Sequence, residues 1–140
     1  MIQRITLAEV EEITFSLAKT LMDWHEPIPD FGSRYPERLE SCLETPFQTF
    51  NRQDLYSSFV NKVSIFFYLM NKNHPFENGN KRLAVTTLLV LLFKNEQWLS
   101  VSVMELYEFA KEVAASKPEA KDATVTRINS FITQSLTDLE

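Results

Sequence analysis

The sequence contains only two glycines, Gly32 and Gly79, and one cysteine, Cys42, in 140 residues. Folds made of short strands and tight turns usually need more glycine, so this scarcity and the regular apolar spacing favour helices. A single cysteine excludes a disulfide framework within the chain and a metal site built from cysteines. The composition therefore indicates a helical fold without disulfides.

Positive charge is also scarce, because 14 Lys and Arg stand against 19 Asp and Glu and the formal net charge is −5. General nucleic-acid binders usually present a basic face, so no nucleic-acid partner is expected. The longest apolar stretch, residues 83–93, is interrupted by two threonines and is well short of the roughly 20 residues of a membrane helix. Residues 1–12 are amphipathic and acidic, unlike a signal peptide. These features predict a cytoplasmic protein with no membrane partner.

Apolar residues recur at helical spacing along most of the chain, which predicts a single all-α domain over residues 1–140 with about six helices. A capping box at residues 6–9 predicts the start of the first helix, which is expected to continue through Leu21 and Trp24 and to end at Pro27. A second capping box at residues 102–105 predicts another helix start. Asp122 is expected to cap the last helix.

The middle of the chain alternates between strong and weak helical patterns. Residues 55–70 predict a helix, and a helix from about residue 80 to 95 is apolar nearly all round, as in the buried centre of a bundle. Residues 30–45 have a weaker pattern, which we interpret as an exposed loop or short β-hairpin followed by one or two helical turns. Pro46 is expected to begin another short helical stretch.

Residues 74–82 connect the two central helices and read His-Pro-Phe-Glu-Asn-Gly-Asn-Lys-Arg. The first amides of a helix point outward with a partial positive charge, and Gly79 allows close approach of a ligand. Lys81 and Arg82 add two full charges, so the loop is suited to bind phosphate. Histidine titrates near neutral pH, so His74 could accept a proton from a hydroxyl.

The residues alone leave a second interpretation open. A histidine after a helix can be structural, an Asn-Gly pair is often only a turn, and Lys-Arg at a helix start is usually a solvated end. The dipole disfavours that basic pair, however, and a bound anion would offset the unfavourable placement.

The pattern His-Pro-Phe-x-x-Gly-Asn-x-Arg resembles the signature of the Fic/Doc superfamily, with six fixed positions in a nine-residue window. Residues 32–46 are similar to the stretch that precedes the motif in Doc-like (death-on-curing) members, where a flap lies over the active site. The resemblance covers nearly the whole chain. It implies a helical bundle with a flap at about residues 30–45, and an enzyme that moves part of a nucleotide onto a protein hydroxyl.

Roles follow from the resemblance position by position. His74 matches the general base, and Gly79, Asn80 and Arg82 match the phosphate-binding residues. Lys81 replaces the glycine of most Fic enzymes and is similar to Doc, whose family role is protein kinase. The family usually has an acid that holds Mg²⁺ where this chain has Asn78, and an amide oxygen is a weak, uncharged ligand for that ion.

Three functions stay open at this point. The first is a Doc-like protein kinase toxin that uses ATP and Mg²⁺. The resemblance then implies a target docked along the flap, with a translation elongation factor as precedent. The second is a Fic-type AMP-transferase, and the third is a nucleotide-binding relic weakened at Asn78. The chain has no complete copy of the inhibitory Ser/Thr-x-x-x-Glu-Gly/Asn motif of many Fic proteins, so a separate antitoxin chain is expected.

Overall fold

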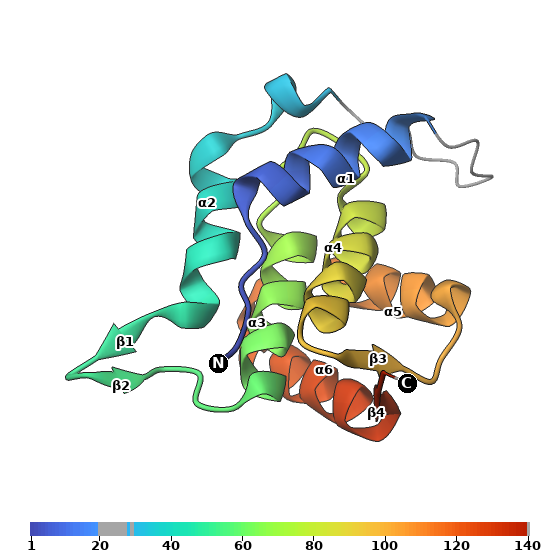
Figure 1. Cartoon of the computed structure of the whole chain (residues 1–140). Helices are drawn as coiled ribbons and strands as arrows, with labels where there is room; N and C mark the ends of the chain where they lie inside the picture. Colours follow the sequence, from blue (N-terminus) through green and yellow to red (C-terminus); the bar gives the residue numbers. More distant parts are fainter. Residues whose placement is uncertain (20–27, 29, 140) are drawn as a thin grey trace.

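A computed structural model describes residues 1–19, 28 and 30–139. Within them it has six α-helices and only two short strand pairs, which confirms the all-α prediction (Figure 1). The helices are α1 (Leu7–Lys19), α2 (Pro36–Glu44), α3 (Phe59–Lys72), α4 (Asn80–Lys94), α5 (Val103–Ala115) and α6 (Lys121–Ser135). In the described ranges no helix is long and apolar enough to cross a membrane.

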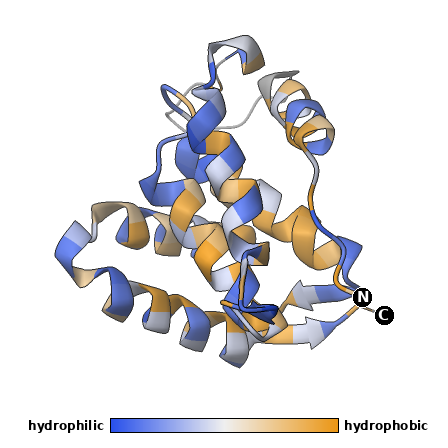
Figure 2. Cartoon of the chain, turned by 90° about the vertical axis from the view of Figure 1, so that its left-hand side faces the viewer, coloured by the Kyte–Doolittle hydropathy of each residue, from blue (hydrophilic) through white to orange (hydrophobic). Residues whose placement is uncertain are grey.

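The antiparallel helices α3 and α4 form the centre of the bundle, and the other four helices pack around them (Figure 1). Leu83, Leu88 and Leu92 of α4 are fully buried, as expected for a helix that is apolar nearly all round. In Figure 2 the hydrophobic residues, drawn in orange, lie mainly on the parts of the helices that face the middle of the bundle. The core is therefore built on the two helices that the motif loop connects.

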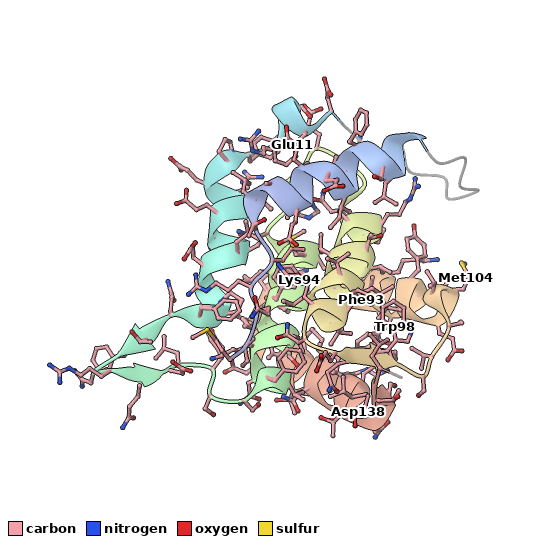
Figure 3. All side chains as sticks on the ribbon, in the orientation of Figure 1. Glu11, Phe93, Lys94, Trp98, Met104 and Asp138 are labelled. Carbon is pink, nitrogen blue, oxygen red and sulfur yellow. The ribbon has the colours of Figure 1, made fainter. Side chains whose placement is uncertain are left out.

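One apolar residue of α4 is exposed. Phe93 is 58% exposed near the end of the helix, and Trp98 and Met104 on the elements that follow are 37% and 52% exposed. Figure 3 shows all three side chains on the outside of the bundle, away from the motif loop.

Both predicted capping boxes are confirmed. At the start of α1 the Thr6 N–H donates to Glu9 Oε1 at 2.9 Å, and the Glu9 N–H donates to Thr6 Oγ1 at 3.1 Å. Ser102 and Glu105 make the same reciprocal pair at the start of α5. The continuation of the first helix through Leu21 and Trp24 to Pro27 lies outside the described residues.

Two predicted helix starts are wrong. Asp122 does not cap α6, because a 3-10 turn, η3 (Pro118–Ala120), runs directly into the helix and leaves this aspartate in its first turn. The helix predicted from residue 55 begins at Phe59, because Ser58 caps it by accepting the Asn61 N–H. Leu55 is 55% exposed, so its spacing matched the helical stripe only by coincidence.

The chain before α3 forms a β-hairpin that the sequence did not predict, made of β1 (Thr49–Phe50) and β2 (Gln53–Asp54). It projects from the bundle beyond the end of α2 (Figure 1). At its base the buried Lys62 Nζ lies 3.0 Å from Asp54 Oδ2 and also contacts the Tyr56 carbonyl. A second unpredicted pair joins β3 (Gln97–Leu99) to β4 (Leu136–Asp138).

The predicted flap, residues 30–45, is helical and contains no strand. It consists of a 3-10 turn, η1 (Phe31–Ser33), two extended residues, and α2. The weak sequence pattern belongs to a short helix in which only Leu39 and Cys42 are buried. Because so little of this helix is buried, few of its residues are apolar. Pro46 lies in a short helical turn as predicted, as the second residue of η2 (Thr45–Phe47).

Candidate active site

The motif begins where α3 ends. Asn73 is the last residue with helical backbone angles, and its N–H donates to the Leu69 carbonyl at 2.8 Å. The next residue, His74, has φ 45°, in the left-handed region. This position after a helix usually carries glycine, because other residues are strained there by about 1–2 kcal/mol. The exposed imidazole therefore sits on a backbone that the surrounding structure must hold in place.

Phe76 anchors the loop in the hydrophobic core. Its side chain is 1% exposed, and its ring centroid lies 6.2 Å from that of Phe31 in η1. The guanidinium carbon of Arg34 lies over the Phe31 ring, 4.2 Å from its centroid. The flap and the motif loop therefore share one packed aromatic contact.

Asn80 closes the loop with its side chain. Its Oδ1 accepts the Phe76 N–H at 3.0 Å, and its Nδ2 donates to the Phe76 carbonyl at 2.8 Å. These two bonds fix which way the amide points, so the same Nδ2 faces His74 Nδ1 at 3.4 Å. An amide nitrogen can only donate, and the contact therefore favours the histidine tautomer with its proton on Nε2. The sequence suggested only a phosphate-binding role for Asn80, and the structure gives its side chain a role in loop geometry.

The N-terminus of α4 faces the same loop. Gly79 precedes the helix with φ 71°, which glycine adopts without strain. The helical hydrogen bonds begin with Leu83 N–H to the Gly79 carbonyl, at 2.9 Å. The amides of residues 80–82 precede this ladder, at the positive end of the helix dipole. Lys81 is half-buried and Arg82 is only 4% exposed, so the second cation lies in the protein interior.

Several hydrogen bonds join the flap to the residues at the start of the motif. The Tyr35 N–H donates to the Pro75 carbonyl at 2.9 Å, and Asn73 Nδ2 donates to the Arg38 carbonyl at 3.0 Å. Arg38 Nη1 also reaches the His74 carbonyl at 3.4 Å. Sequence reasoning placed the flap over the loop but did not identify Asn73 as a contact. In the sequence, Asn73 is marked only by its place between the end of a predicted helix and Pro75.

Asn78 is the residue that the sequence resemblance aligns with the metal ligand of the family. Among the described residues its Oδ1 is buried and has no hydrogen-bond partner, whereas the neighbouring Glu77 is exposed. The described parts of the chain contain no group of three or more His, Cys, Asp or Glu that could hold a metal. The Asn78 amide oxygen could serve as one neutral ligand of a metal ion.

Comparison with known proteins agrees with this geometry. The model of the Fic/DOC family matches residues 5–92, which include α1, the flap, α3, the whole motif loop and most of α4. No curated protein and no solved structure matches the chain. Members of the family are generally nucleotide-dependent transferases that modify proteins. The match covers more than half of the chain, and this protein belongs to the Fic/Doc family.

Proposed function

We propose that this protein is a Doc-like kinase that transfers the γ-phosphoryl group of ATP to a hydroxyl group of a target protein. The observation that carries the proposal is the junction of α3 and α4, where one loop places His74 at its start and Lys81 in the first turn of the following helix. A proton acceptor and a cationic phosphate site within nine residues are the two parts that such a transfer needs.

In the proposed reaction the target hydroxyl transfers its proton to His74, and its oxygen attacks the γ-phosphorus of ATP. The bond from the γ-phosphorus to the bridging oxygen breaks, and ADP leaves with that oxygen. In the tautomer that Asn80 favours, the lone pair is on Nδ1, so the hydroxyl would replace the long Asn80 contact at that atom. Mg²⁺, when bound, would neutralise charge on the phosphate oxygens.

Lys81 is the reason to favour phosphate over AMP as the transferred group. Glycine at this position leaves room for two adjacent phosphates, whereas a lysine side chain fills part of that space. Lys81 is half-buried in the first turn of α4, where its ammonium favours one terminal phosphate beside the amides of the helix start. This interpretation requires ATP to bind with its γ-phosphate at the loop.

The flap is the proposed docking surface for the target protein. Tyr35 is 40% exposed, Arg38 is exposed, and both lie next to the start of the motif loop through their hydrogen bonds to Pro75 and His74. A protein segment bound along these residues would reach the imidazole. We also propose that a separate antitoxin chain inhibits the enzyme, since the chain carries no complete inhibitory motif.

The test is to incubate candidate target proteins with the purified protein and ATP labelled at either the α- or the γ-phosphate. Label from the γ-phosphate only, absent with His74→Ala, is the expected result. Label from the α-phosphate would instead establish AMP transfer and overturn the kinase proposal. With Lys81→Gly, γ-transfer should fall and α-transfer should appear, because the space for a second phosphate is restored. No label with either nucleotide would favour the weakened relic.

A further inference from the structure

His74 is fixed on both sides by residues at the start of α2. The residue before it, Asn73, donates through Nδ2 to the Arg38 carbonyl at 3.0 Å, and the carbonyl of the residue after it, Pro75, accepts the Tyr35 N–H at 2.9 Å. The His74 carbonyl itself lies 3.4 Å from Arg38 Nη1. Three successive residues of the motif region are therefore bonded to the start of α2, to Arg38 in its first turn or to its N-cap, Tyr35.

These bonds act where the backbone is strained. The left-handed φ of 45° at His74 is unfavourable for a residue with a β-carbon, so it persists only because neighbouring groups impose it. Asn80 fixes the loop from the side of α4, through Phe76 and the ring nitrogen. The bonds to α2 are the corresponding constraint on the side of α3.

Of these bonds, only the one made by Asn73 comes from a half-buried side chain that is itself adjacent to His74. Asn73 is also the C-cap of α3, so its backbone conformation is set by that helix. Its side chain therefore ties the end of α3 to the start of α2 at the point where the chain turns into the left-handed residue. Loss of this tie would let the His74 backbone relax and displace the imidazole.

We propose that Asn73 is a positioning residue, which holds His74 in place by locking the first turn of α2 onto the end of α3. This inference rests on the proposed function of His74 as the proton acceptor. It predicts an effect on the chemical step and little effect on nucleotide affinity, because Asn73 touches neither Lys81 nor the start of α4 in the described contacts.

A matched control separates positioning from plain stability. Asn129 Nδ2 in α6 donates to Asn61 Oδ1 in α3 at 2.7 Å, which is also an asparagine bond between two helices and lies away from the loop. Asn73→Ala and Asn129→Ala should lower the denaturant midpoint by similar amounts. Only Asn73→Ala should reduce kcat, by roughly 10- to 100-fold, with KM for ATP changed by less than about 2-fold. A folded Asn73→Ala protein with the kcat of wild type would overturn the proposal.

A second readout does not depend on activity. The chain has two histidines, so the ¹⁵N signals of the imidazole rings can be assigned with a single His74→Ala spectrum. The His74 ring signals should move in Asn73→Ala and stay in place in Asn129→Ala, because only the first releases the loop. Unchanged ring signals in Asn73→Ala would overturn the positioning role. If wild type transfers no group, the proposed function fails, and the ring signals alone then decide this inference.

Arg38→Met provides a variant that leaves α3 and its cap intact. It removes the Nη1 bond to the His74 carbonyl and keeps the aliphatic part of the side chain and the backbone carbonyl that accepts from Asn73. The expected result is a smaller loss of kcat than in Asn73→Ala, with the same shift direction in the ring spectrum. If Asn73→Ala does not fold, Asn73→Leu takes its place, because leucine keeps the size of the side chain and has no N–H to donate to the Arg38 carbonyl. Wild-type kcat and ring signals in a folded Asn73→Leu protein would overturn the proposal.

Discussion

The side-chain amide of Asn80 pairs with both backbone polar groups of Phe76, with Oδ1 3.0 Å from its nitrogen and Nδ2 2.8 Å from its oxygen. Both residues are buried, at 4% and 1% exposure. These two hydrogen bonds close the motif into a loop. The conformation of the proposed base, His74, therefore depends on Asn80, six positions later in the sequence. Several measurements can test this arrangement.

Asn80→Ala should weaken both the fold and the reaction. Truncation leaves the buried Phe76 N–H and carbonyl without their partner, which costs roughly 1–3 kcal/mol in the free energy of unfolding. Transfer should fall by about 10²-fold, since the loop loses its geometry. Thr87→Val is the control, because it removes a buried hydroxyl bond in the same helix, α4, without touching the loop. Equal activity of the two variants would contradict the role given to Asn80.

The strain at His74 predicts an unusual order of stability. Both His74→Ala and His74→Gly should abolish transfer, but the glycine variant should be more stable than the alanine variant by about 1 kcal/mol. The reason is that glycine accepts the observed φ of 45° and alanine does not. Denaturant unfolding of the two inactive proteins measures the difference. An alanine variant of higher stability would mean that the backbone at this position is not left-handed.

Asn78→Asp should lower the Mg²⁺ concentration needed for activity. The buried Oδ1, which has no hydrogen-bond partner within the described part of the chain, would become one oxygen of a charged carboxylate, and Mg²⁺ binds carboxylates more strongly than amides. Transfer measured against Mg²⁺ concentration gives the midpoint, and calorimetric titration of Mg²⁺ with ADP present checks it independently. Lower activity at an unchanged midpoint would assign Asn78 another role.

Cys42 should be unreactive in the folded protein. Burial raises the pKa of this thiol to about 12, so the reactive thiolate is scarce at pH 8. A thiol reagent should therefore modify the native protein very slowly and the denatured protein at the rate of an ordinary cysteine. Because the folded pKa lies above the unfolded one, the thiol contributes stability at neutral pH that is lost as pH rises from about 9 towards 12. Cys42→Ala should show a weaker loss over this window.

The parts of the fold that were predicted correctly depend on residues close together in the sequence. The capping box of Thr6 and Glu9 needs only four residues, and the buried helix α4 is recognisable from its own apolar composition. Pairing of β3 with β4 was not predictable, because it joins Trp98 to Thr137 across 39 positions with strands of three residues each. The hairpin turn was equally hidden, since Asn51 and Arg52 adopt positive φ where a glycine would normally signal the turn.

The candidate site was also predictable only where it depends on residues close together in the sequence. The motif sequence indicated His74, Asn78, Gly79, Asn80, Lys81 and Arg82 as the residues of interest, and the structure places all of them between the end of α3 and the first turn of α4. The sequence could not show that the Asn80 side chain bonds back to Phe76, or that α2 holds the residues around His74. Both depend on three-dimensional contacts that a residue type does not specify.

The bond between the Phe76 N–H and a buried side chain has a consequence for hydrogen exchange. An amide in a surface loop normally exchanges with solvent quickly, because small local motions expose it. The Phe76 amide is instead bonded to a side chain carried by α4, so it can exchange only when the start of that helix separates from the loop. Its protection should approach that of the core amides of α3 and α4. The exchange rate of this single backbone amide would then report whether the loop opens on its own or only when the central helices unfold.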